Sequence, residues 1–211
     1  MRFPKAHAGV TKIFIAQILV IVAAVIGLTG TILLFIPPTT VIGATVGLVS
    51  LILMVLAFIL QLVGLYQGGY DEGNFRVAFY VVIVAIVLTA LGIILGRIPG
   101  MPSIVPSVLE TVGDVSAVIV TLYTLFGIAV LAKKLGDERM ATRGKTLGIL
   151  VFILFAASTI LGLIPTFVTA GENEPLKIFF AVIGIGAAVI ELITYVLIFF
   201  YLGRATKMLR K

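Results

Sequence analysis

The chain has no Cys, no Trp and a single His, and only 11% of its 211 residues are charged. Without Cys, disulfide bonds, thiolate nucleophiles and Cys-containing metal cages are excluded. The one histidine, His7, lies in the polar N-terminal segment, so no Ser-His-Asp or Cys-His nucleophile is expected inside a membrane core. Soluble domains carry about 25% charged residues. The composition is therefore not typical of a water-soluble globule.

Apolar residues make up 61% of the chain, and the mean hydropathy is +1.29. Six stretches are long enough to cross about 30 Å of hydrocarbon as helices that rise about 1.5 Å per residue. They lie near 13–36, 41–66, 77–98, 112–132, 146–168 and 177–202. Membrane barrels would need alternating segments of roughly ten residues, and none occur. We expect an all-α polytopic membrane protein with six transmembrane helices in a single domain, 1–211.

The distribution of Lys and Arg predicts the orientation of these helices. The N-terminal segment, the second and fourth loops and the C-terminal tail hold thirteen of the fifteen Lys and Arg residues, and only Arg97 and Lys177 fall on the other side. The positive-inside rule then places both termini in the cytoplasm, with the chain in a cell membrane, most simply a bacterial cytoplasmic membrane. This basic face is expected to attract anionic lipid headgroups. The net charge of +6 is a topology signal, and no nucleic-acid partner is expected.

A short motif recurs at one separation along the chain. Residues 45–50 and 111–116 are identical at five of six positions, 66 residues apart. The same separation relates Asp71 to Asp137 and Pro99 to Pro165. We interpret this as a two-helix hairpin used three times, over about 13–70, 71–136 and 137–204. Each unit crosses the membrane twice, so the three repeats are expected to be parallel, related by an axis along the membrane normal.

Glu191 is the only acid well inside a predicted span. An ionised carboxylate at the bilayer centre is costly, so such a residue usually faces the bundle interior or a wet cavity, and is paired or protonated. The candidate partners share a hydroxyl group and are Thr194, Tyr195, Tyr123 and Thr124. Two interpretations stay open. Glu191 is either a proton or cation site on the bundle axis, or a protonated carboxyl group that holds its helix in register.

Small residues mark candidate helix contacts. Glycines four apart allow two helices to approach closely. This spacing occurs in Gly43 with Gly47 and in Gly92 with Gly96, while Gly184 and Ala188 form a small face beside Glu191. Contact within one chain is the simpler interpretation, and a homodimer seam is the alternative.

Polar residues at predicted helix starts suggest caps. Asp71 or Asn74 is expected to cap the third helix, and the repeated pair Asp137–Glu138 the fifth, because acids are favourable at helix N-termini. Ser107 followed by Glu110 resembles a capping box for the fourth helix.

No Gly-rich phosphate loop, carboxylate dyad or metal motif occurs in the sequence. We therefore expect neither an enzyme nor a bound cofactor or metal. The first hypothesis is a scaffold or accessory subunit that packs with itself or with a membrane protein partner, using the basic loop 133–145. The alternative is a small channel or transporter for a proton, cation or small solute, with Glu191 in the pathway. A lipid-handling protein is the third hypothesis.

Three short hairpins whose alternate helices close at Pro37, Pro99 and Pro165 resemble the layout of the HdeD-like short-repeat membrane family. Members of this family are six-helix bacterial inner-membrane proteins, mostly without an assigned role and in one case linked to acid stress. The resemblance implies the same six-helix layout and supplies no catalytic residue. The hairpin ends at 70–79 and 133–138 also look like those of uncharacterised six-helix membrane proteins of Gram-positive anaerobes.

Overall fold

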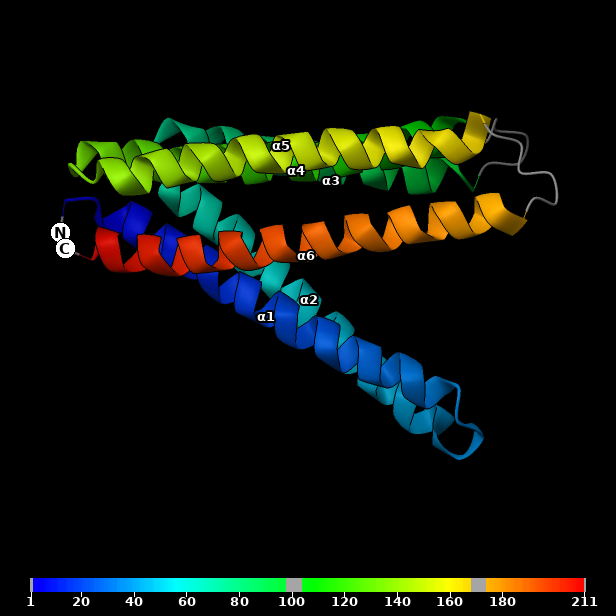
Figure 1. The fold of residues 1–211 in the computed structure, drawn as a ribbon. Helices are drawn as coiled ribbons and strands as arrows, with labels where there is room; N and C mark the ends of the chain where they lie inside the picture. The colour runs from blue at the N-terminus through cyan, green and yellow to red at the C-terminus, as the bar shows by residue number, and fades with distance from the viewer. Residues whose placement is uncertain (1, 98–103, 168–173, 211) are drawn as a thin grey trace. The chain divides into compact units, whose positions relative to one another are not determined.

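The computed structural model of the chain describes residues 2–97, 104–167 and 174–210 (Figure 1). Within these ranges, the side chains of Pro37, 104–110, Asp114 and 158–191 lie outside the description. Every element described is a helix. The helices are α1 (Pro4–Leu34), the short 3-10 helix η1 (Pro37–Thr39), α2 (Thr40–Gly68), α3 (Gly73–Leu95), α4 (Ile104–Lys134), α5 (Glu138–Phe167) and α6 (Glu174–Leu209).

Six of the described helices are long and apolar enough to cross a membrane. The predicted all-α fold with six spans is thus confirmed, and it indicates a multi-pass integral membrane protein. The helices extend further than the apolar runs at the basic end. α1 begins at Pro4 rather than near 13, and α6 continues to Leu209 rather than ending near 202. A helix satisfies its backbone polar groups internally, so it continues through polar turns that an apolar window leaves out.

The turn between α1 and α2 follows from two prolines and a threonine. Proline lacks a backbone N–H, so Pro37 and Pro38 cannot continue α1. The Thr39 hydroxyl donates to the carbonyl oxygens of Leu33 at 2.9 Å and Ile36 at 3.0 Å. These bonds satisfy carbonyl groups that the helix end leaves without partners.

The turn between α4 and α5 is equally complete. Gly136 has φ +82°, the left-handed conformation that glycine adopts without strain. The Asp137 N–H donates to the carbonyl of Ala132 at 2.9 Å, and the Gly136 N–H to that of Lys133 at 3.0 Å, which is a Schellman motif. The Asp137 carboxylate then accepts from the Met140 N–H at 2.9 Å. The predicted cap on the fifth helix is therefore confirmed for Asp137.

The capping box predicted for the fourth helix is wrong. α4 already includes Ile104, so Ser107 lies inside the helix and not at its start. Pro106 falls within the first turn, where a missing N–H leaves no hydrogen bond unmade. Pro175 holds a similar place as the second residue of α6.

The chain divides into two compact units. Unit 1 consists of Met1–Phe79 with Leu202–Lys211, and unit 2 consists of Tyr80–Tyr201. Unit 1 holds α1, α2, the start of α3 and the end of α6. Unit 2 holds the rest of α3, all of α4 and α5, and α6 as far as Tyr201.

Candidate functional site

The predicted polar site centres on α6. Glu191 lies in this helix, as do Gly184 and Ala188, but the surroundings of these three residues fall outside the described side chains. Thr194 is buried, with 7% of its surface exposed, and Tyr195 is half-buried. Thr194 is three positions and Tyr195 four positions after Glu191, so both lie on its face of the helix.

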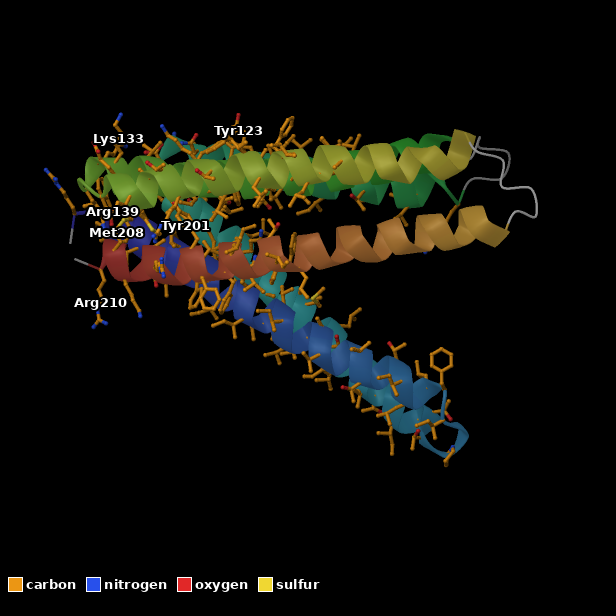
Figure 2. All side chains as sticks on the ribbon, in the orientation of Figure 1. Tyr123, Lys133, Arg139, Tyr201, Met208 and Arg210 are labelled. Atoms are coloured by element: carbon orange, nitrogen blue, oxygen red, sulfur yellow. The ribbon has the colours of Figure 1, made fainter. Side chains whose placement is uncertain are left out.

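The expected partners from α4 lie on different faces of that helix. Thr124 is buried, and its hydroxyl donates to the carbonyl oxygen of Val120 in the same helix at 2.7 Å. Tyr123 is half-buried. Because of the bond to Val120, the hydroxyl proton of Thr124 is already used within its own helix. Figure 2 shows Tyr123 and Tyr201 on opposite sides of α4 and α5.

The four predicted packing glycines have different surroundings. A Cβ atom on Gly43 would lie 2.9 Å from the carbonyl oxygen of Gly30, so Gly43 packs on α1 within the chain. A Cβ atom on Gly47 would meet no atom within 4 Å. Gly92 is buried in α3, while Gly96 follows the last residue of that helix and is exposed. The four-residue spacing thus does not describe the main contact between helices in unit 1.

That contact is a seam of small residues with a seven-residue period. The seam consists of Gly9, Ala16, Ala23 and Gly30 on α1, and Gly43, Ser50, Ala57 and Gly64 on α2. All are buried except Ser50, which is half-buried. A seven-residue period keeps the same positions in contact when two helices wind around each other with a left-handed supercoil. Small side chains at these positions allow the two backbones to approach closely.

Three contacts establish the register of the seam. Gly9 lies against Gly64, and Gly30 lies against Gly43. Between them, the Ser50 hydroxyl donates to the carbonyl oxygen of Ala23 at 2.7 Å. The helices are antiparallel and lie side by side (Figure 1), so seven residues forward on α1 correspond to seven residues back on α2. The same register places Ala16 opposite Ala57, and both are 1% exposed.

The two ends of the seam are in backbone contact. A Cβ atom on Gly9 would lie 2.5 Å from the Gly64 carbonyl oxygen and 2.7 Å from the Gly68 nitrogen. A Cβ atom on Gly30 would lie 3.0 Å from the Gly47 nitrogen. A carbon atom needs about 3.5 Å from such neighbours. Glycine is therefore required at these positions because of the close approach of two helix backbones.

Asp71 caps a different helix from the one expected. Its carboxylate accepts a hydrogen bond from the Ala6 N–H at 2.7 Å. Ala6 lies in the first turn of α1, where backbone N–H groups have no partner within the helix and negative charge is favourable. Asp71 follows α2 in sequence but acts on α1, because the hairpin brings the start of α1 beside the end of α2. Asn74, the other cap candidate, donates to the Glu72 carboxylate at 3.2 Å.

Two lysines and two tyrosines gather at the same end of the hairpin. We call Lys5, Lys12, Tyr66 and Tyr70 the lysine–tyrosine cluster. The Lys5 ammonium lies 4.1 Å from the centre of the Tyr70 ring, and the Lys12 ammonium donates to the Gln67 side-chain oxygen at 2.6 Å. The hydroxyl groups of Tyr66 and Tyr70 are hydrogen-bonded to each other. The cluster thus joins the first turns of α1 to the last turn of α2.

In unit 2, glycines on α5 make room for aromatic rings. The Tyr201 phenol lies so close to Gly144 that any Cβ atom there would overlap it, and its hydroxyl donates to the Met140 carbonyl at 3.3 Å. A Cβ atom on Gly144 would also lie 3.0 Å from the Ala129 methyl group of α4. Gly148 accommodates the Phe126 ring in the same way. Gly144 is therefore the point where α4, α5 and α6 meet.

The described polar groups serve helix packing. Each buried side-chain nitrogen and oxygen in the described part of the chain has a hydrogen-bond partner. Among the same residues, no group of three His, Asp or Glu side chains could hold a metal ion. In unit 1, the lysine–tyrosine cluster presents a surface that is both cationic and hydroxyl-bearing.

Comparison with known proteins found no match. No known protein family matches the chain, and neither a curated protein nor a solved structure matches it. The resemblance to the HdeD-like family stays a prediction.

Sequence reasoning missed the seam and the lysine–tyrosine cluster. The seam has a sequence signal, because small residues recur at every seventh position from Gly9 to Gly30 and from Gly43 to Gly64. A search for a period of seven, in place of pairs four apart, would have found it. The bond between Asp71 and the Ala6 N–H has no such signal, because it joins residues that only the hairpin brings together.

Proposed function

We propose that the protein is a non-enzymatic membrane subunit whose α1–α2 hairpin packs against the membrane helices of a partner, a second copy being the simplest. The outer surface of α2 is the observation that carries this proposal. Only 6% of the apolar stretch of α2 is buried within the chain. The seam uses small residues, and many of the large side chains of both helices are exposed, although Val10, Ile13 and Leu65 are buried. Leu51 on α2 and Leu28 on α1 are each 65% exposed.

One face of α2 is shaped for a helix. Ala44, Gly47, Leu48 and Leu51 follow a helical spacing and so share a face. Glycine inside a helix costs about 1 kcal/mol relative to alanine. The Gly47 backbone lies near Gly30 of α1, but a Cβ atom on Gly47 would meet no atom within 4 Å, so nothing within unit 1 requires glycine at this position. Close packing of a partner helix backbone at Gly47 would offset that cost. Lipid tails pack on a helix without needing glycine there.

Substitution of Gly47 tests the proposal. Gly47→Leu places a large side chain into open space, so the hairpin should keep its fold while a partner helix is displaced. The assay is cross-linking of tagged chain in membranes through Leu48→Cys, which is selective because the chain has no native Cys. We expect the Leu48→Cys protein to give a cross-linked product when residue 47 is glycine, and to lose it when Gly47→Leu is added. Leu28→Cys, on α1, serves as the control position for cross-linking. A monomer in both cases would refute the proposal.

The proposal includes an orientation and a repeat. We place both termini in the cytoplasm of a bacterial cytoplasmic membrane, with the helices arranged as three parallel hairpins. No charged residue occurs between Lys12 and Asp71, so all charges of the first hairpin lie at one end, which supports this orientation. An impermeant thiol reagent added to intact cells should label Thr40→Cys, at the start of α2 beside the connection from α1, and leave Lys207→Cys unlabelled. The reverse pattern would contradict the orientation.

A proton or cation pathway at Glu191 is the second candidate. It is favoured by Thr194, a buried hydroxyl-bearing residue one turn from Glu191 on α6. In proteoliposomes that carry a pH gradient, Glu191→Gln should then abolish proton flux and leave the helical content unchanged. Equal flux in the two proteins, or none in either, would exclude the pathway.

A further inference from the structure

The lysine–tyrosine cluster has hydrogen-bond donors that the chain does not use. The Lys5 ammonium lies on the face of the Tyr70 ring, which attracts cations but accepts no full hydrogen bond. Lys12 directs one of its three N–H groups to Gln67. In the pair of tyrosine hydroxyls, one proton lies between the two oxygens and the other is left to donate outward. Tyr66 and Tyr70 are each 52% exposed, so an external acceptor can reach them.

The acids of unit 1 are engaged elsewhere. The Asp71 carboxylate accepts the Ala6 N–H, and the Glu72 carboxylate accepts the Asn74 amide. Unit 1 contains eight Lys and Arg residues and only these two acids. The donors in these two bonds are neutral, so both carboxylates keep their charge, but the eight cations outnumber them. Unit 1 therefore carries a net positive charge, which favours an anionic ligand at the cluster.

The position of the cluster along α2 indicates the depth of that ligand in the bilayer. A helix of 29 residues is about 43 Å long, whereas the hydrocarbon core is about 30 Å thick. The last turns of α2 therefore reach the headgroup layer. The Tyr66 ring also packs on Phe79 with ring centres 5.6 Å apart, which extends the aromatic surface to the start of α3. Tyrosines at the end of a span are typical of this interface.

We infer that the lysine–tyrosine cluster binds the phosphate group of an anionic phospholipid. Lys5 supplies charge, the unused tyrosine hydroxyl proton supplies a directed hydrogen bond, and Lys12 supplies a second cationic donor. The acyl chains lie along the exposed apolar surface of α2, where Val63 is 38% exposed and Phe58 is 42% exposed. A free phosphate ion shares the headgroup chemistry but cannot use this apolar surface.

Native mass spectrometry of the full chain in mild detergent tests the site. The probes are phosphatidylglycerol, phosphatidylcholine and inorganic phosphate. Tyr66→Phe with Tyr70→Phe keeps both rings and removes only the hydroxyls, while Lys5→Gln removes the charge. The matched control is Lys145→Gln, which makes the same charge change at an exposed site on α5. We expect roughly tenfold weaker retention of phosphatidylglycerol in the two cluster variants, the effect of one hydrogen bond to a charged group.

The same data contain the outcomes that would overturn the inference. Phosphatidylcholine retention should not change, and Lys5→Arg should keep the site because it keeps the charge. Equal losses in Lys5→Gln and Lys145→Gln would mean diffuse surface attraction and no site. Competition by inorganic phosphate as strong as that by the lipid would mean a free-anion site. Unchanged retention in the double tyrosine variant would refute the role of the hydroxyls, whether or not Lys5→Gln folds.

Discussion

Replacing Gly9 with alanine adds one methyl group at the tightest point of the small-residue seam. That methyl carbon would lie 2.5 Å from the Gly64 carbonyl oxygen and 2.7 Å from the Gly68 nitrogen. Both neighbours are backbone atoms, so no side chain can rotate away. The helices must separate by about 1 Å to restore a contact distance near 3.5 Å, which also weakens the dispersion contacts on either side.

In the monomeric chain, where no partner helix lies at Gly47, Gly47→Ala is the matched control for this change. It is chemically identical and lies in the same hairpin, but the added methyl group meets no atom within 4 Å. Both substitutions gain about 1 kcal/mol of helix propensity, and this gain cancels in the comparison. Overpacking costs about 1–3 kcal/mol. We therefore expect Gly9→Ala to be less stable than Gly47→Ala by about 1–3 kcal/mol.

The free energy of unfolding should be measured by reversible titration with sodium dodecyl sulfate in mixed micelles. The chain has no Trp, so near-ultraviolet circular dichroism of Tyr and Phe reports the tertiary structure. Far-ultraviolet circular dichroism should show the same helical content in both variants. Equal stability of the two variants, within about 0.5 kcal/mol, would refute the close backbone contact at Gly9.

Three further substitutions test other parts of the fold. The double variant Ala16→Cys with Ala57→Cys should form a disulfide on mild oxidation, because the seam register places the two residues opposite each other; absence of the gel shift that reducing agent reverses would contradict the register. Gly136→Ala should lower the unfolding free energy by about 1–2 kcal/mol because φ is +82° there, whereas Gly73→Ala, with open space around it, should not. Tyr201→Phe removes one hydrogen bond to the backbone of α5 and should lower it by about 0.5–1.5 kcal/mol; no loss in thermal denaturation would show that the ring alone matters.

Local chemistry explains why the number of helices and one of the turns were predictable. A segment that crosses lipid must be apolar along its length, so the spans appear in the composition of short windows. Gly136 followed by Asp137 ends α4 and starts α5 by contacts between near neighbours in the chain. Similar local logic placed Pro37 after α1, because proline cannot continue the helix.

Features that depend on contacts between helices were not predictable in the same way. Asp71 and Asp137 occupy equivalent places in the predicted repeat, yet Asp137 caps its own helix and Asp71 caps α1. Asp71 follows Tyr70 whereas Asp137 follows Gly136, but this local difference does not indicate that Asp71 caps α1. Gly43 and Gly47 look alike as a pair four apart, but a Cβ atom on Gly43 would overlap the backbone of α1, whereas a Cβ atom on Gly47 would meet no atom within 4 Å. Every face of these helices is apolar, so composition does not indicate which face meets another helix.

By itself, the sequence determined that the chain forms six apolar helices, and that a turn joins α1 to α2 and another joins α4 to α5. These properties depend on single segments and on the cost of exposing polar backbone to lipid. Only the tertiary structure decided which small residues form the seam between α1 and α2, which helix Asp71 caps, and that Lys5 lies on the Tyr70 ring. Those contacts join positions far apart in the chain. Their partners are set by the register of two packed helices. Lipid tails are as apolar as the helix faces, so hydrophobicity does not distinguish a face that packs on another helix from one that contacts lipid.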